Sequence, residues 1–223
     1  MARVVGADVW KKGWIAVVTV DGWIASIDAY DTMAELASTE ADAEVIAVDI
    51  PIGLPVAPPR AADAAARRFI GARGSSVFPT PPRDVLEEGS YKEALRFSRK
   101  RYGIGLTAQS YALRDRILET DAVARSDERV IEVHPEVTFR VLAGRPLAFS
   151  KRTWNGHSER RRLLSGVGLS IPDRLPDAVG AVPADDILDA GAAVWTAARY
   201  AAGEARTLPG EMPLPGFGEV IWY

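Results

Sequence analysis

Four aspartates stand where their carboxylates could act together. Asp8 ends a short apolar strand near the start of the chain, and Asp49 ends a second apolar strand. Asp186 and Asp189 are three residues apart, which places both on one face of a helix. Carboxylates that meet in an apolar setting repel one another, and they stay ionised at neutral pH only with cations between them. An all-oxygen ligand set favours Mg²⁺ or Mn²⁺, and a pair of such ions can clamp both oxygens of a phosphodiester displacement.

The pattern around these aspartates predicts an α/β fold. Residues 3–20 have the composition and central turn of a β-hairpin, and residues 44–54 form the uninterrupted apolar run typical of a buried parallel strand. The ends of neighbouring strands in such a sheet converge on one edge, so Asp8 and Asp49 meet if their strands are adjacent. A helix packed across that edge adds Asp186 and Asp189.

The rest of the chain predicts one domain over residues 1–223, with insertions at about 55–106 and 143–182. We expect strands over residues 3–8, 14–20, 23–30, 44–54, from 129 to the Pro135 step, and 219–223, and helices over residues 31–43, 60–70, 90–101, 107–122, 158–165 and 183–203. Residues 71–82 are expected to form an irregular loop. Asp185 is expected to cap the last helix, and the plainer interpretation of Asp189 is a surface residue of that helix.

The strand that starts near residue 129 carries two further candidates. Glu132 and His134 are two residues apart, so both face one side of a strand. If that strand neighbours the Asp8 strand, Glu132 becomes a further ligand and His134 a general base or a phosphate contact. The alternative for His134 is a structural hydrogen bond at the end of the strand.

Basic side chains and one loop offer contacts to phosphate. The loop around Arg73 combines a guanidinium, two hydroxyls and flexible backbone N–H groups, which suits an anion. Its alternative is a turn that leads into a proline-rich stretch. The phosphate-binding candidates are Lys12, Arg73, Ser75, Ser76 and Lys151.

The composition excludes several kinds of site. The chain has no cysteine, which rules out disulfides, thiol catalysis and cysteine-held zinc or iron–sulfur centres. It has two histidines, so any metal should have oxygen ligands. No apolar run is long enough for a membrane span, and the start lacks the pattern of a signal peptide. We therefore expect no membrane association and a cytoplasmic location; the oligomeric state is left open.

Basic residues are concentrated in three segments of a chain whose net charge is −3. Residues 60–83, 92–101 and 145–162 carry +4, +4 and +5, so the rest of the chain carries −16. An acidic body with basic segments could hold cations centrally and phosphates at its rim, which indicates nucleic acid as a partner. The alternative is that each segment is a solvated helix face.

Several motifs together resemble a known family. They are Gly6-Ala-Asp8 with Lys12-Gly-Trp14, Val48-Asp-Ile-Pro-Ile-Gly53, Arg73-Gly-Ser-Ser-Val-Phe-Pro-Thr-Pro-Pro-Arg83, Gly105-Leu-Thr-Ala-Gln109, Glu132-Val-His-Pro-Glu136 and Asp185-Asp-Ile-Leu-Asp-Ala190. The chain resembles an uncharacterised family of predicted RNase H-like nucleases (domain of unknown function four-two-nine), distantly similar to Holliday-junction resolvases. The resemblance implies an RNase H-like mixed sheet in the order β-β-β-α-β-α-β-α with helical and loop insertions.

The same resemblance implies a metal-dependent nuclease in which Mg or Mn is held by Asp8, Asp49, Asp186 and Asp189. The acid of the central strand is Asp49, where the resolvase and ribonuclease H patterns usually have Glu, so the shorter side chain could shift or weaken one ion. Two other functions stay open. One is a phosphotransferase or ATPase of the sugar-kinase or actin-like type, although Val9 to Gly13 has one glycine instead of a glycine-rich phosphate turn. The other is a non-catalytic module that binds a nucleotide or anion.

Overall fold

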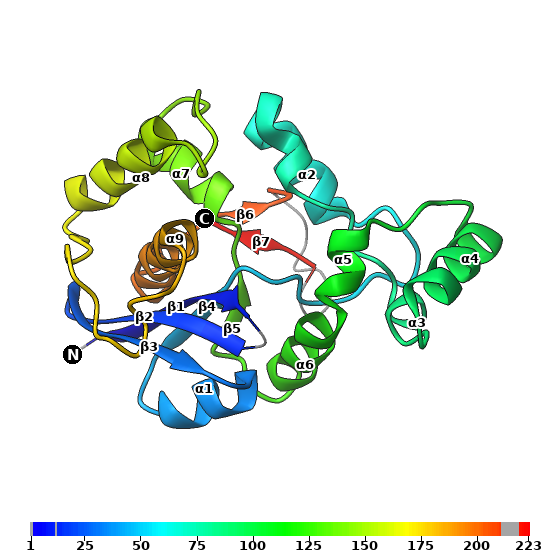
Figure 1. The fold of residues 1–223 in the computed structure, drawn as a ribbon, viewed down its shortest axis with the longest axis horizontal. Coiled ribbons are helices and arrows are strands. Elements are labelled where there is room, and N and C mark those ends of the chain that lie inside the picture. Colours follow the sequence, from blue (N-terminus) through cyan, green and yellow to red (C-terminus); the bar gives the residue numbers. More distant parts are fainter. Residues whose placement is uncertain (1, 12, 211–218) are drawn as a thin grey trace.

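A mixed five-stranded sheet forms the centre of the protein, in the order β3-β2-β1-β4-β5 (Figure 1). The structure is a computed structural model that describes residues 2–11, 13–210 and 219–223. The strands are β1 (Arg3–Trp10), β2 (Gly13–Val20), β3 (Trp23–Tyr30), β4 (Val45–Val48) and β5 (Val130–Glu132). The first three pair antiparallel, whereas β1, β4 and β5 run parallel. The fold class is therefore α/β, as the sequence predicts.

Nine α-helices surround this sheet in the described part of the chain. They are α1 (Met33–Thr39), α2 (Ala61–Ile70), α3 (Arg83–Leu86), α4 (Tyr91–Tyr102), α5 (Ala108–Ala112), α6 (Arg114–Ala124), α7 (Pro135–Ala143), α8 (Trp154–Gly166) and α9 (Ala184–Ala201). A 3₁₀ helix, η1 (Gly71–Ser76), follows α2. Two short strands, β6 (Thr207–Leu208) and β7 (Ile221–Trp222), pair antiparallel. Helices α2 to α6 all lie between β4 and β5 in the sequence, and α3 and α4 project to one side of the molecule (Figure 1).

The two faces of the sheet are covered by different helices. Val4 in β1 belongs to the core under α9, whereas Val5 belongs to the core under α1 and α6. In β4, Ala47 lies on the α9 side and Val48 on the opposite side. Successive side chains of a strand alternate between faces, so the parity that points Val4 toward α9 points Asp8 there as well. The hydrophobic pattern of β1 thus decides which helix Asp8 meets. The strand does not end at Asp8 as expected, because β1 continues to Trp10.

Several expected boundaries are corrected by the structure. The expected helix over residues 107–122 is divided at Leu113 into α5 and α6. The helix expected to begin at residue 158 starts at Trp154, because the Thr153 side chain accepts a hydrogen bond from the Gly156 N–H and caps it. Residues 71–76 of the expected loop form η1. The strand expected over residues 44–54 ends at Val48.

Two expectations about helix and strand ends are also wrong in detail. Asp185 does not cap α9, because Pro183 holds the cap position without a side-chain hydrogen bond and Asp185 lies in the first turn. The strand expected over residues 219–223 is β7, which pairs with β6 and does not form an edge strand of the main sheet. Trp222 of β7 makes one parallel bridge to Val133, just after β5.

Candidate metal centre

A close approach of α9 to β1 brings the early and late aspartates together. A Cβ atom on Gly6 would lie 2.0 Å from the Val194 backbone N and 2.4 Å from the Ala190 backbone O. Glycine at this position therefore lets the backbone of α9 rest directly on the strand, where any side chain would push it away. The contact lies two residues before Asp8 and one residue after Asp189. The packing of small residues thus fixes how close these two carboxylates come.

Three carboxylates form a tight cluster at this edge of the sheet. Asp8, Asp49 and Asp189 each offer one oxygen, and these three oxygens lie within 4.8 Å of one another. Asp8 is 8% exposed and Asp189 is 2% exposed. Asp8 Oδ1 accepts the Val9 N–H at 2.7 Å, whereas Asp189 Oδ1 has no hydrogen-bond partner among the described residues. A buried oxygen without a partner is costly, which indicates a cation or a proton at this point.

The electrostatics of the cluster agree with that conclusion. Burial, followed by repulsion from Asp49 and Asp189, raises the pKa of Asp8 well above its ordinary value. Burial and the Asp189 charge do the same to the pKa of Asp49. Burial raises the pKa of Asp189 to about 6, although its ion pair with Lys151 acts in the opposite direction. All three pKa values rise for the same reason, because several carboxylates are buried close together and are poorly solvated. A divalent cation would offset this negative charge.

Lys151 is the cation that touches this cluster. It lies in the loop before α8, and its Nζ forms an ion pair with Asp189 Oδ2. Burial alone would lower the pKa of Lys151, but Asp189, Asp8 and Asp49 raise it overall, so the amine stays charged. Sequence analysis placed Lys151 among phosphate contacts, whereas in the structure its ion pair is with a carboxylate.

Asp186 lies beside the cluster but is not part of it. It is half-buried one turn before Asp189, and burial and its neighbour Asp185 raise its pKa. Its charge also raises the pKa of Asp8, so it contributes to the field of the site. Three of the four metal ligands implied by the resemblance therefore lie close together, and the fourth, Asp186, lies just outside this cluster.

The carboxylates line a cavity of about 360 Å³ that also collects most of the other candidates. Its wall includes Arg73, Ser76, Glu132, His134 and Lys151. Ser75 is exposed and is not among the described residues of this wall, and Lys12 lies outside the described residues.

Glu132 faces this cavity yet has a structural partner. Its two carboxylate oxygens accept hydrogen bonds from both terminal nitrogens of Arg60, one at 2.8 Å, and Oε2 also accepts the Ile52 N–H at 2.7 Å. Arg60 binds Asp63 at 3.0 Å in addition. Burial raises the pKa of Glu132, but the guanidinium and the N–H favour its ionised form. The residue therefore ties the segment after β4 to α2, and it does not join the carboxylate cluster.

His134 does not share a strand with Glu132, contrary to the sequence-based expectation. Strand β5 ends at Glu132 because Pro135 occupies the first turn of α7, and His134 becomes the cap of that helix. β5 also neighbours β4 and not β1. His134 Nδ1 accepts the Glu136 N–H at 3.2 Å, and burial lowers the His134 pKa to about 4. The ring is therefore neutral, and its hydrogen bonds with the Glu136 and Ser76 backbone fix its orientation at the start of α7.

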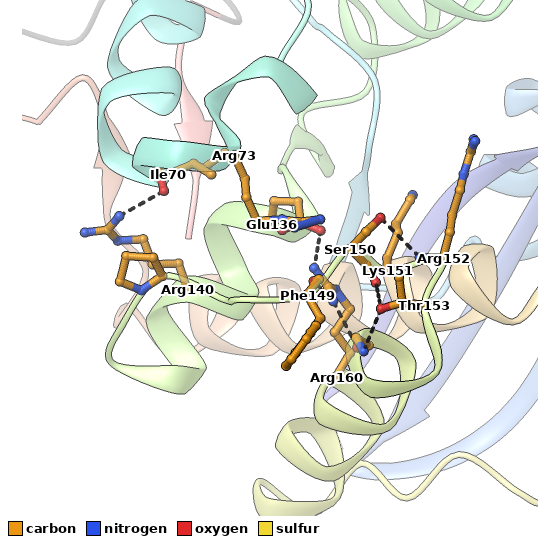
Figure 2. Close-up of polar contacts among 12 residues, drawn as sticks. Ile70, Arg73, Glu136, Arg140, Phe149, Ser150, Lys151, Arg152, Thr153 and Arg160 are labelled. Carbon is orange, nitrogen blue, oxygen red and sulfur yellow. Dashed lines mark hydrogen bonds and ion pairs between the residues drawn. The ribbon is translucent and has the colours of Figure 1, made fainter.

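Three residues of this region were not among the predicted site residues. Glu136 accepts a hydrogen bond from the fully buried Arg160 at 2.5 Å and pairs with Arg73 at 3.6 Å. Arg152 also lines the cavity, and its side chain extends in the same direction as that of Lys151 (Figure 2). Arg160 belongs to the basic segment 145–162, interpreted from sequence as a rim for phosphates or a solvated helix face, and nothing in the sequence separates a buried guanidinium from an exposed one.

The fold and this acidic pocket define an α/β protein with a buried carboxylate cluster. The sequence profile of one family, described as protein of unknown function (DUF429), matches residues 6–213, so the chain belongs to that family. Comparisons with curated proteins and with solved structures gave no significant match. Among the described residues, no helix combines the length and the apolar character that crossing a bilayer requires.

Proposed function

We propose that this protein is a metal-dependent nuclease of RNase H-like fold, which hydrolyses phosphodiester bonds with Mg²⁺ or Mn²⁺. The observation that carries the proposal is the cluster of Asp8, Asp49 and Asp189, with three oxygens within 4.8 Å of one another. Buried carboxylates in this number are unfavourable unless a cation joins them. The element order supports the fold, because a three-stranded antiparallel unit is followed by a helix, a parallel central strand, further helices, another parallel strand and the late helix α9.

The residues present fit such an ion. Every donor in the cluster is a carboxylate oxygen, which is the ligand type that Mg²⁺ and Mn²⁺ prefer. Asp189 Oδ1 is buried and has no partner among the described residues, so it offers a lone pair at no cost in broken bonds. When bound, the ion supplies Lewis-acid stabilisation of phosphoryl oxygens and a more acidic water.

The protein's own side chains supply the complementary charges. Lys151 brings a positive charge to the edge of the carboxylate cluster, and Arg73 and Arg152 line the same cavity. A phosphate that enters meets these cations, of which a guanidinium can bind two of its oxygens at once. His134 is neutral and held by the backbone of Glu136 and Ser76, so it adds a fixed polar ring to the same wall. Glu136 lies between Arg73 and Arg160 and forms an ion pair with each (Figure 2).

The test is cleavage of a labelled panel in Mn²⁺: single-stranded DNA, duplex DNA, a branched junction, RNA and an RNA–DNA hybrid. We expect cleavage of at least one substrate by the wild type and none by Asp8→Asn. The matched control is Asp42→Asn, which changes an exposed aspartate away from the cavity and should cleave like the wild type. Equal cleavage by Asp8→Asn would refute the site. Silence across the panel with a metal-dependent rise in melting temperature would move the chemistry to a small phosphorylated ligand.

A further inference from the structure

Helix α4 presents a basic face that has no partner in the described part of the chain. Lys92, Arg96, Arg99 and Lys100 are all exposed. Their spacing of four, three and one residues places them on one side of the helix. None of their side chains makes a hydrogen bond or an ion pair with a described residue. The single acidic residue of the helix, Glu93, is engaged with Ser90 at the helix start.

The opposite side of α4 is firmly anchored, so this face has a fixed direction. Ala94 packs with Val85 and Leu106 in a small core of its own. Tyr102 Oη donates a hydrogen bond to Asp84 at 2.7 Å, and Tyr91 Oη donates one to the Leu106 carbonyl at 3.0 Å. The basic residues are therefore displayed by a packed helical unit and not by a loose charged segment.

This helical unit starts and ends at the wall of the acidic cavity. Thr80, just before α3, lines the cavity, and the chain returns to the same wall at Gln109 in α5 and at Leu113. Figure 1 shows α3 and α4 projecting beyond α5 from that point. A ligand that lies along α4 is thus beside the segment that leads back to the cavity.

The chemistry of the face selects a polymer of phosphates. Residues 92–101 carry +4 on a protein whose net charge is −3. Lys92, Arg96 and Lys100 rise about 6 Å per step along the helix axis, which gives a row of charges about 12 Å long. Duplex DNA presents about one negative charge per 1.7 Å of its axis, so several phosphates can face this row at once. A small metabolite would span only one or two of these positions.

We infer that α4 is a docking surface for the phosphate backbone of a nucleic acid. That the docked strand then reaches the cavity for cleavage rests on the proposed nuclease function, whereas docking itself requires no metal and no chemistry. Contacts of this kind position a strand without reading its bases. The surface therefore adds affinity and alignment, and it adds no sequence preference.

The test is fluorescence anisotropy with labelled single-stranded and duplex DNA in EDTA, which separates binding from metal and cleavage. The test variant carries Arg96→Gln, Arg99→Gln and Lys100→Gln. The matched control carries Lys11→Gln, Arg174→Gln and Arg206→Gln, which remove the same charge from exposed positions outside the three basic segments. For three lost phosphate contacts, the slope of log affinity against log salt should become shallower by about 2 for single strands and about 3 for duplex. The control should keep the wild-type slope, and both variants should melt like the wild type.

Equal affinity and slope in the two triple variants would overturn the docking surface. Wild-type binding to phosphatidylserine vesicles with no binding to either DNA would also overturn it. Asp8→Asn should bind DNA in EDTA like the wild type, because it alters only the cavity. If binding depends on α4 while the cleavage panel stays silent, the docking surface is supported and only the nuclease proposal fails.

Discussion

Replacing Lys151 with methionine should lower the stability of the protein in the absence of metal, and adding a divalent ion should largely remove that loss. The Lys151 amine pairs with Asp189 Oδ2, and its charge also acts on Asp8 and Asp49. Methionine keeps a similar stem and removes the charge. Without metal the carboxylates then lose their cation, whereas with metal the ion no longer competes with a lysine for Asp189.

The magnitude follows from the burial of the two partners. Removing one member of a buried ion pair costs about 3–5 kcal/mol. The Lys151 side chain is 31% exposed and Asp189 can take up a proton, so we expect a smaller loss of about 2–3 kcal/mol in EDTA. For a chain of this length, 1 kcal/mol corresponds to about 2–4 °C in melting temperature, which predicts a fall of about 4–12 °C. Saturating Mn²⁺ should bring the variant close to the metal-bound wild type.

The assay is thermal unfolding in EDTA and across a Mn²⁺ titration. Lys92→Met is the matched control, because Lys92 is exposed on α4, away from the cavity, and should respond to metal like the wild type. The expected result is a larger metal-induced rise in melting temperature for Lys151→Met, with half-saturation at a lower Mn²⁺ concentration. A rise equal to or smaller than that of the wild type would show that Lys151 does not compete with an ion, and the reasoning from its ion pair would be refuted.

Three further predictions concern pH, the buried ion pair and the packing of α9. The folded Asp189 has a pKa of about 6 against an ordinary 3.8, so it binds its proton more tightly when the protein is folded. In EDTA the contribution of Asp189 to stability should therefore fall as pH rises from about 4 to 6, and Asp189→Asn should gain stability relative to the wild type over that range. A stability difference that does not change with pH would contradict this. Arg60→Met leaves Glu132 and Asp63 buried without their cation, and it should lower the free energy of unfolding in urea by about 3–5 kcal/mol. Adding Glu132→Gln should restore part of that loss. A loss below about 1 kcal/mol would be inconsistent with a structural role for the Arg60–Glu132 ion pair. Gly6→Ala should both destabilise the fold and weaken Mn²⁺ binding, because its Cβ would lie 2.0 Å from the backbone of α9. Gly105→Ala is the control, because its Cβ would meet nothing within 4 Å. Unchanged Mn²⁺ affinity in Gly6→Ala would show that the packing of α9 on β1 does not determine the geometry of the metal site.

The meeting of the aspartates was predictable because local rules determine it. The hairpin and the apolar strand at residues 44–54 indicate neighbouring strands, and the alternation of side chains in β1 aims Asp8 at one face. The long alanine-rich helix then supplies Asp189, once it packs on that face. Each element is recognisable from residues close in sequence, whereas the pairing of β1 with β4 and the packing of α9 on Gly6 join residues that are far apart.

The roles of Glu132 and Lys151 were not predictable, because distant partners decide them. Glu132 is bound by Arg60, which is 72 residues away, and that guanidinium removes it from the carboxylate cluster. Lys151 is 38 residues from Asp189 and reaches it from an irregular loop. A charged residue in a sequence carries no mark of which opposite charge it will meet, so burial and pairing emerge only from the assembled fold. His134 was misplaced for a local reason, because the strand expected to reach the Pro135 step ends at Glu132 and His134 already caps the helix that Pro135 opens.

The charges of the site divide the proposed activity into two separable parts. The centre of the cavity is negative, since three carboxylates and the nearby Asp186 outweigh Lys151, and a phosphate alone would be repelled there. The face of α4 is positive and needs no ion to attract a phosphate backbone. A nucleic acid should therefore dock in EDTA but enter the cavity only when a divalent ion has neutralised the carboxylates. These two steps depend on different residues. A variant that loses cleavage but still docks therefore identifies the cavity as the place where the phosphodiester bond is cleaved. A variant that loses both, but is still stabilised by the metal ion, identifies α4 as the surface that delivers the substrate.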